Sequence, residues 1–414
     1  MSFTALAEQI LVEAKKIDEH EAAGREISSL ATTAGAPNPD NFSVEFKNSR
    51  ETLINTAGQL LRQSLSPRDF IREKMCTATD ILSLQAIYRY DIPTKVDQKT
   101  GTTFAQLAAQ TGMQEAVLKR ILRNAVTTGI FEEKTPGSLN HNATSLCLLD
   151  TSFLSFVGFV SEDLINFHMR ALDAVEKWPG SQEPNESGFN LAYQTDEPLF
   201  NYFEKHPELA TRAGKAFRGI HNTTVHSASS LWQEIDRPGA VMVDVGGGFG
   251  HIALAIARVT KNLKLIVEDL PGTVEIAAKE LPPELKERVS FQAQDFFTEQ
   301  QVKGADVYFF SKIFHDWGDE YCIRILRSLI PAMKEGARVV INEWVIPEQA
   351  KPENAQRFKR FSDLTMLATH NGKERMKEEW KQLFKTADKR FGPVEFTEWP
   401  WSDFVHVSAA WNPA

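Results

Sequence analysis

The feature that most restricts the fold of this chain is a glycine-rich segment, Val243-Asp244-Val245-Gly246-Gly247-Gly248-Phe249-Gly250. It follows a short apolar run and precedes a stretch whose apolar residues have helical spacing. From there to residue 345, β-branched runs alternate with helical patterns, which is typical of a doubly wound parallel sheet and predicts an α/β Rossmann-like domain. We expect strands over 240–245, 263–268, 288–292, 305–310 and 337–345, and helices over 250–259, 272–281 and 319–334.

The glycine spacing separates two classes of ligand. Dinucleotide-binding turns follow G-x-G-x-x-G and hold a pyrophosphate at a helix N-terminus. Here the glycines alternate as Gly246, Gly248 and Gly250, and position 251 is His. This spacing after Asp244 resembles the first motif of S-adenosylmethionine (SAM) dependent methyltransferases. Asp244 would repel a pyrophosphate but can order a turn beside a sulfonium, so we expect Asp244, Gly246, Gly247 and Gly248 to bind SAM; a glycine turn without a ligand is the alternative.

Acidic residues follow the next two predicted strands. In Glu268-Asp269-Leu270-Pro271, Asp269 stands where a carboxylate takes both ribose hydroxyls in Rossmann sites, and Leu270 follows it. Asp295 and Phe296 end the third strand, where an acid can accept from an adenine amino group and an aromatic ring can cover one face. We expect Asp269, Leu270, Asp295 and Phe296 to contact the cofactor.

The N-terminal half has a different, almost wholly helical pattern. Residues 2–24, 48–64 and 66–88 show helical spacing, and Ser66-Pro67 is a good start for the last of these. Two short helices then follow in 102–150, and we expect Ile130-Phe131-Glu132 to pair with Leu146-Cys147-Leu148-Leu149 as a hairpin. This order is the winged-helix pattern, which serves either DNA binding or dimerisation.

The remaining N-terminal segments suggest where the domains meet. Residues 151–178 form one long helix that is apolar nearly all round, so it is buried or faces a subunit or a ligand. The segment 178–188 has the composition of a linker, and helical segments at 197–206 and 208–235 lead into the α/β part. We therefore expect a helical and winged-helix dimerisation domain over 1–178 and a SAM-binding Rossmann-like domain over 190–414.

Composition argues against several classes of protein. With 46 basic and 55 acidic residues the formal charge is −9, and the second winged-helix helix carries only three basic residues, so we expect no nucleic-acid partner. The three cysteines have no paired spacing, which indicates neither a disulfide framework nor a zinc site. Glu8 and Glu13 interrupt the N-terminal apolar pattern, and no run reaches the length of a membrane span. We expect a cytoplasmic protein with no membrane anchor and no metal.

Several motifs beyond the glycine turn point to one family. They are Ser311-Lys312-Ile313-Phe314-His315-Asp316-Trp317, Asn342-Glu343-Trp344 and Gly372-Lys373-Glu374-Arg375. With the glycine turn and Asp269-Leu270-Pro271, the chain resembles the plant and fungal small-molecule O-methyltransferases over nearly its whole length. That resemblance implies a homodimer, SAM as the cofactor, His315 as the general base, and Glu343 and Glu374 as the acids beside it.

The chemistry of such a base is sound on independent grounds. A phenol with a pKa near ~10 is mostly protonated at neutral pH, and giving its proton to a histidine near ~6.5 is uphill by roughly 5 kcal/mol. Carboxylates that hold the imidazole in one tautomer and stabilise its charged form offset that cost. The remaining requirement is the alignment of oxygen, methyl and sulfur. A solvated or core histidine is the alternative for His315.

The segment before His315 departs from the family. Family members usually place Lys or Arg four residues before the histidine and a neutral or aromatic residue three before it, whereas this chain has Ser311 and Lys312. Ser311 is then a cofactor contact. Lys312 either points to solvent or places an ammonium beside the substrate, where it could hydrogen-bond a carbonyl or lower the pKa of a phenol.

The substrate side is expected to contain ring-contacting and polar residues. Besides Lys312, the candidates are Asp316, Phe159, Met366 and His370, with Phe167 and Trp317 as further aromatic positions. The expected reaction is methylation of a hydroxyl on an aromatic or polyketide-type secondary metabolite. The rivals are a SAM-binding pericyclase or dehydratase on the same scaffold, in which Lys312 replaces the base, and a winged-helix regulator that senses SAM.

Overall fold

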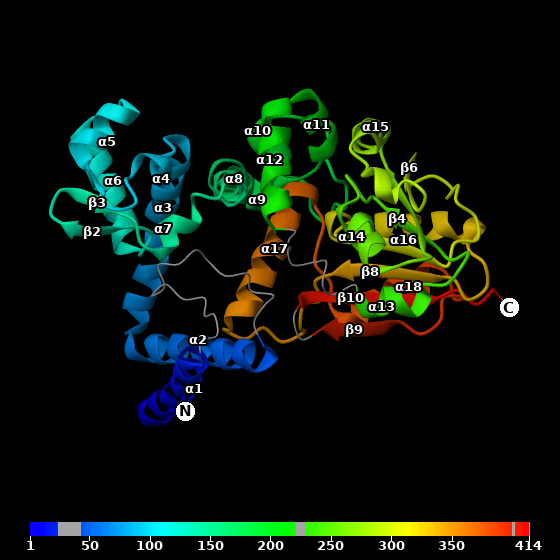
Figure 1. Ribbon diagram of the computed structural model, residues 1–414, viewed down its shortest axis with the longest axis horizontal. Helices are drawn as coiled ribbons and strands as arrows, with labels where there is room; N and C mark the ends of the chain where they lie inside the picture. Colours follow the sequence, from blue (N-terminus) through cyan, green and yellow to red (C-terminus); the bar gives the residue numbers. More distant parts are fainter. Residues whose placement is uncertain (24–42, 221–228, 400–401, 414) are drawn as a thin grey trace. The chain divides into compact units, whose positions relative to one another are not determined.

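The computed structural model describes residues 1–23, 43–220, 229–399 and 402–413 (Figure 1). The chain divides into two compact units: one comprises 1–166, 202–221 and 352–354, and the other comprises 167–201, 222–351 and 355–414. The predicted domain ranges, 1–178 and 190–414, remain predictions. None of the described helices has both the length and the apolar character needed to cross a membrane.

The first unit is built mainly from helices. Ser66 caps the third helix as predicted, because its hydroxyl accepts from the amide of Asp69 at 3.2 Å. The helices are α1 (Phe3–Ala22), α2 (Val44–Ser64), α3 (Pro67–Arg89), α4 (Ile92–Lys95), α5 (Phe104–Thr111), α6 (Glu115–Thr127), α7 (Ala143–Cys147), α8 (Thr151–Gly158) and α12 (Pro207–Ile220). Helix α8 continues through a π-helical segment, Phe159–Leu164, into α9 (Ile165–Lys177), so the predicted long helix over 151–178 is present with a π-bulge in its middle.

A small sheet completes the winged-helix arrangement, but with a different hairpin from the predicted one. The strands β2 (Glu132–Thr135) and β3 (Ser138–Asn140) pair through a turn at Gly137, and β1 (Thr102–Thr103) pairs with β3. The predicted strand over 146–149 was wrong, because Asn142 and Ser145 form a reciprocal cap that starts helix α7 there. Helices α5 and α6 lie beside this sheet in Figure 1, as in a winged helix.

The second unit contains a seven-stranded sheet in the order β6-β5-β4-β7-β8-β10-β9. The first five are parallel, and β10 runs antiparallel to β8 and β9. Their bounds are β4 (Val241–Val245), β5 (Lys264–Asp269), β6 (Val289–Ala293), β7 (Val307–Ser311), β8 (Arg338–Glu343), β9 (Glu395–Trp399) and β10 (Ser402–Ala410). The parallel strands match the predicted ranges within about two residues, and the predicted Rossmann-like fold is confirmed.

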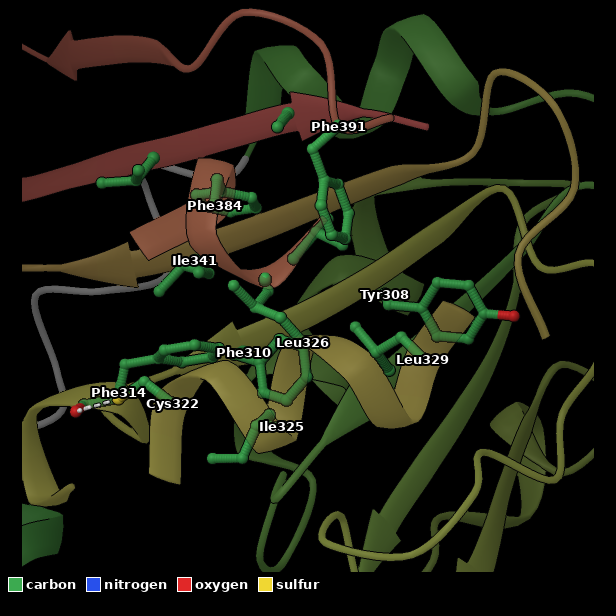
Figure 2. Packing of buried hydrophobic residues seen from close by; sticks show 14 of the residues in the cluster. Tyr308, Phe310, Phe314, Cys322, Ile325, Leu326, Leu329, Ile341, Phe384 and Phe391 are labelled. Atoms are coloured by element: carbon green, nitrogen blue, oxygen red, sulfur yellow. Dashed lines mark hydrogen bonds between the residues drawn. The ribbon is translucent and has the colours of Figure 1, made fainter. Parts of the chain in front are cut away.

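Helices α14 (His251–Val259) and α15 (Pro271–Lys279) pack against strands β5 and β6. The unit also contains α10 (Gly188–Tyr193), α13 (Ser229–Ile235), α16 (Asp319–Leu329), α17 (Asn354–His370) and α18 (Lys377–Ala387), and the residues of α11 (Leu199–Lys205) are divided between the two units. Successive residues of each central strand enter opposite faces, because side chains alternate along a strand. Tyr308 and Phe310 pack with residues of α16 and α18 (Figure 2), whereas Val307 and Phe309 pack against the side of Trp232 and α14.

The strand order places a site at the carboxyl ends of the parallel strands. Strand β4 lies in the middle, and the chain continues to β5 and β6 on one side and to β7 and β8 on the other. Ligands in such sheets bind beyond the carboxyl ends of the strands at this reversal of order. In this unit, those ends carry the glycine turn, Asp269, Ser311 and Glu343.

Candidate active site

The glycine turn after β4 has a backbone that requires glycine. Gly246, Gly248 and Gly250 all have positive φ, at 71°, 58° and 75°. Gly247 has no room for a side chain, since a Cβ there would lie 2.7 Å from the carboxyl carbon of Asp244. A Cβ on Gly248 would meet nothing within 4 Å, so the outer side of the turn is open to a ligand.

Two acids contact this turn from the ends of strands β4 and β5. Asp269 Oδ2 accepts from the amide of Gly248 at 2.8 Å, and its Oδ1 accepts from the amide of Leu270 at 2.8 Å. Asp244 is buried, and burial together with the nearby charge of Asp269 raises its pKa to about 7. Its Oδ2 has no hydrogen-bond partner among the residues that the structure describes. The turn therefore combines open space with a buried polar atom that no described residue satisfies.

The other predicted cofactor residues also lie at the carboxyl ends of the parallel strands. A Cβ on Gly246 would lie 3.7 Å from the ring of Phe296, which follows β6 and packs edge-on against Phe297 and Trp317. Asp295 is exposed, and its Oδ1 accepts from the amide of Phe297. Ser311 ends β7, where its hydroxyl accepts from the side-chain amide of Asn342 at 3.0 Å.

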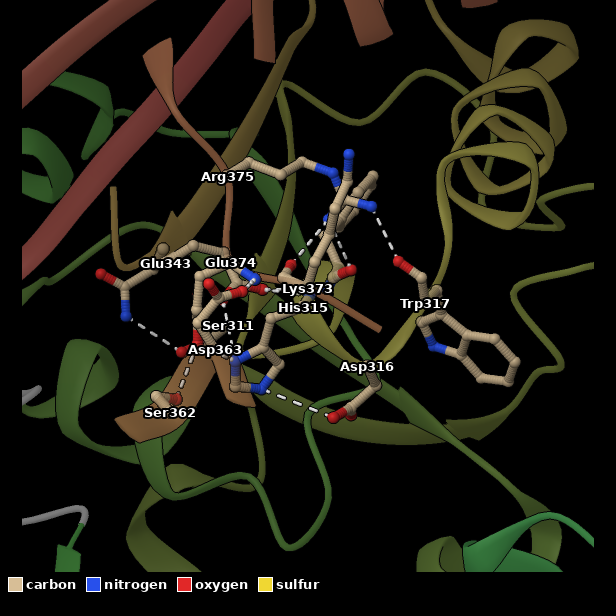
Figure 3. Close-up of polar contacts among 12 residues, drawn as sticks. Ser311, His315, Asp316, Trp317, Glu343, Ser362, Asp363, Lys373, Glu374 and Arg375 are labelled. Carbon is tan, nitrogen blue, oxygen red and sulfur yellow. Dashed lines mark hydrogen bonds and ion pairs between the residues drawn. The ribbon is translucent and has the colours of Figure 1, made fainter. Parts of the chain in front are cut away.

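His315 lies on a one-turn 3₁₀ segment, Phe314–Asp316, between β7 and α16. Its Nδ1 lies 2.9 Å from Glu374 Oε1 and 3.5 Å from Glu343 Oε2, while Asp316 Oδ1 lies 3.6 Å from Nε2 (Figure 3). Because a carboxylate only accepts, the short contact to Glu374 places a proton on Nδ1. The structure thus brings together the three residues predicted as catalytic.

Each glutamate is fixed by a second contact. Glu343 ends β8 with a fully buried side chain, and its Oε1 accepts from the amides of Phe314 at 2.9 Å and His315 at 3.3 Å. Glu374 Oε1 also accepts from the hydroxyl of Ser362 on α17 at 2.8 Å. Sequence reasoning missed Ser362, since it belongs to no motif and comes to Glu374 only through the packing of α17.

These charges change the acidity of His315. Burial lowers the pKa of His315, but the carboxylates of Glu343, Glu374 and Asp316 outweigh it and raise that pKa to about 10. Burial in turn raises the pKa of Glu343 to about 7, against the opposing effect of His315. The imidazole therefore carries its proton at neutral pH in the free enzyme.

A buried arginine holds the segment that carries His315. The guanidinium of Arg375 is fully buried and donates to the carbonyls of Phe314 at 2.9 Å and Trp317 at 2.7 Å, on either side of the turn. It also pairs with Asp319 at 2.9 Å. A Cβ on Gly372 would lie 2.2 Å from the His315 carbonyl, so the loop that carries Glu374 and Arg375 touches this turn directly.

Lys312 is half-buried, and its role beside the substrate remains a prediction. It has a left-handed backbone, φ 57°, directly after β7, and its Nζ lies 4.8 Å from the centre of the Phe404 ring. Burial lowers its pKa to about 8, and the charges of Glu343 and Glu374 oppose that shift. Phe404 lies on β10, and no feature of the sequence indicated this contact.

The remaining substrate candidates divide between the two units. His370 ends α17, where its Nε2 lies 3.5 Å from Asp316 Oδ1 and its ring stacks on Phe200. Asp316 Oδ1 is therefore close to two imidazoles. Met366 is half-buried one turn earlier on α17. Phe159 is buried in the π-helical segment of the other unit, so its role at this site stays a prediction.

Comparison with known proteins identifies a family. Residues 180–389 match the family defined by the O-methyltransferase domain. The chain is 36% identical to a chlorophenol O-methyltransferase of Trichoderma longibrachiatum over 402 residues, which cover 93% of this chain and 85% of that protein. It is also 40% identical to O-methyltransferase AMT9 of Alternaria alternata over 299 residues, covering 70% of this chain and 69% of the other.

Solved structures support the fold. The crystal structure of OxaC is similar with a TM-score of 0.78 at 22% identity, covering 98% of this chain and 100% of that one. The structure of LepI in complex with SAM gives a TM-score of 0.76 at 20% identity, covering 88% and 94%. With the sequence relatives, these findings show that the chain belongs to the plant and fungal small-molecule O-methyltransferases of class I and uses S-adenosylmethionine as its cofactor.

Proposed function

We propose that this enzyme methylates a phenolic hydroxyl of an aromatic or polyketide-type secondary metabolite, with His315 as the general base. The observation that carries this proposal is the 2.9 Å contact between His315 Nδ1 and Glu374 Oε1. It keeps the Nδ1 proton in place, so Nε2 is the nitrogen that exchanges a proton with the substrate. The relatives' activity as O-methyltransferases supports the same reaction.

The cofactor fits the glycine turn. The open side of Gly248 and the unsatisfied oxygen of Asp244 are the features expected where a ligand approaches the backbone. The residues that would hold SAM are Asp244, Gly246, Gly247, Gly248, Asp269, Leu270, Asp295, Phe296 and Ser311. When bound, SAM supplies an electrophilic methyl group on a sulfonium. The chain's own residues orient the acceptor oxygen and accept its proton.

The raised pKa of His315 lowers the cost of the proton transfer itself, whereas at neutral pH the imidazole must first lose its own proton. A phenol has a pKa near ~10, so a base with a pKa of about 10 takes its proton at little cost, whereas an ordinary imidazole would face roughly 5 kcal/mol. Glu343 and Glu374 stabilise the imidazolium throughout the transfer. The reactive arrangement is either neutral imidazole with phenol or imidazolium with phenolate, which differ only in the position of one proton.

This charge state favours acidic phenols as acceptors. A phenol that is already ionised at neutral pH pairs directly with the imidazolium, and Lys312 adds a second cation close to the same glutamates. The relative from Trichoderma longibrachiatum is described as acting on chlorophenols, which are acidic phenols. Around the acceptor we place Lys312, Asp316, Met366 and His370.

We also propose that the enzyme is a cytoplasmic homodimer. Cys76, Cys147 and Cys322 are free thiols, as expected in a reducing compartment. In the first unit, α3 exposes Ile71, Met75 and Leu82 at 61%, 72% and 51%, which places three large apolar side chains on one face of a helix. A second copy of the chain would cover such a face.

The test is transfer of a labelled methyl group from SAM to simple phenols of graded acidity. We expect labelled product with the wild-type enzyme and a loss of at least 100-fold in kcat in His315→Ala, with SAM affinity unchanged. Lys312→Ala should retain transfer with a higher KM. The rival reaction, a pericyclic or dehydrating step, would instead give product without label that survives His315→Ala and is lost in Lys312→Ala.

A further inference from the structure

The cluster that surrounds His315 has the composition of a transition-metal site. His315 Nδ1 and one oxygen each of Glu343 and Glu374 all lie within 4.8 Å of one another. One imidazole and two carboxylates form a ligand set that zinc accepts, with a fourth position left for water or another ligand. The cluster combines three elements: the turn after β7, the end of β8 and the loop after α17.

Two buried oxygens in this cluster lack donors. Glu343 Oε2 and Glu374 Oε2 have no hydrogen-bond partner within the described parts of the chain, and their side chains are 0% and 1% exposed. A buried anionic oxygen without a donor is costly, so it attracts a cation. Glu343 Oε2 faces His315 Nδ1 at 3.5 Å. That separation is close to the roughly 3.3 Å expected between two ligands of one tetrahedral zinc ion with bonds of about 2.0 Å.

We propose that a zinc ion binds His315 Nδ1, Glu343 and Glu374 as an inhibitor, replacing the proton that Nδ1 donates to Glu374. The neutral imidazole of a zinc-bound histidine carries its single proton on the other nitrogen. With zinc on Nδ1, that nitrogen is Nε2, which then has no lone pair to accept a proton from a phenol. The inhibitory effect rests on the proposed role of His315, whereas the binding of zinc does not.

Other charged groups face the cluster: Asp316 from the same turn, Lys312 from the end of β7 and His370 from the end of α17. Zinc on Nδ1 takes the position of the proton that Nδ1 donates to Glu374, so zinc binding and this hydrogen bond exclude each other.

The test measures zinc binding by calorimetry in the absence of SAM and acceptor, with cobalt absorption as a second readout. We expect one ion per chain. His315→Ala, Glu343→Gln and Glu374→Gln should each weaken binding at least tenfold. SAM affinity serves as the check that each variant is folded. Cys76→Ser, which removes an exposed thiol, is the matched control and should bind zinc as the wild type does.

The second part of the test measures the effect of zinc on the rate of methyl transfer. In wild-type enzyme, zinc should lower kcat for a phenol while leaving its KM nearly unchanged, because the ion takes Nδ1 and leaves the acceptor side open. Zinc affinity that is unaffected by the three cluster substitutions, or that is lost in Cys76→Ser, overturns the proposal. If zinc binds as expected but has no effect on methyl transfer, the base role of His315 fails instead, and the two failures are distinguishable.

Discussion

At the scale of single residues, His315 shows how neighbours determine the function of a side chain. An isolated histidine is a weak base for a phenol, but three carboxylates from three segments raise its pKa to about 10. The same carboxylates keep it protonated at neutral pH. The free enzyme therefore has the conjugate acid in place, and the rate depends on how the single missing proton is distributed between enzyme and acceptor.

The protonated state of His315 predicts different pH profiles for two kinds of acceptor. For a phenol of ordinary acidity, kcat/KM should rise about tenfold per pH unit between pH 7 and 9, because both reactive arrangements have one proton fewer than the prevailing forms. For a phenol with a pKa below 6, imidazolium and phenolate already prevail, so kcat/KM should not rise between pH 7 and 9, and it should fall as Lys312 loses its charge at a pKa of about 8. A plateau near pH 7 for the ordinary phenol would show that the pKa of His315 is not raised.

At the scale of elements, the loop between α17 and α18 contacts the turn that carries His315 in several places. It contributes Glu374 to His315, Arg375 to the carbonyls of Phe314 and Trp317, and Gly372 to a close contact with the His315 carbonyl. Arg375 satisfies buried carbonyls, each of which would cost about 1–3 kcal/mol if left without a donor. The arginine therefore positions the turn without touching the reacting atoms.

Arg375→Met should lower kcat by roughly 100-fold and change SAM affinity much less, because it releases the turn and leaves the glycine turn intact. It should also lower the apparent pKa of His315 in the pH profile, since the imidazole moves from its carboxylates. Lys373→Met is the matched control: Lys373 pairs with Asp319 and Glu379 but not with the turn, so its kcat should stay within about threefold. Equal losses in both variants, with no change in pH profile, would contradict this positioning role.

At the scale of the whole molecule, the exposed apolar face of α3 is the feature that a monomer does not explain. The stripe of Ile71, Met75 and Leu82 repeats at helical spacing, as an interface helix does. About three turns of α3 therefore present large side chains to water in a single copy of the chain.

The double substitution Ile71→Glu and Met75→Glu should convert a dimer to a monomer in sedimentation experiments, because it places four like charges in a twofold apolar interface. Glu73→Lys changes charge on the opposite side of the same helix and should leave the dimer intact. A wild-type monomer at micromolar concentration, or a dimer that survives the double substitution, would rule out this face as the interface.

The fold of the second unit could largely be predicted from local patterns. Short apolar runs between helical patterns identify the central strands. Glycines at every second position identify the turn after β4, because only glycine adopts those backbone angles freely. His315 and Glu343 came together because they follow neighbouring parallel strands, whereas Glu374 reaches His315 from the loop between α17 and α18. In the N-terminal part, the pairing partner of β2 was wrong because a local cap at Asn142 outweighed an apolar run.

The sequence by itself determined the cofactor class and the glycine turn, since both depend on residue type and local spacing. The tertiary structure decided what no local pattern contains: that Ser362 fixes Glu374, that Phe404 lies under Lys312, and that His315 has a raised pKa. These properties arise from side chains far apart in the chain that share one low-dielectric region. Electrostatic effects depend on distance and burial in space, which the order of residues does not specify.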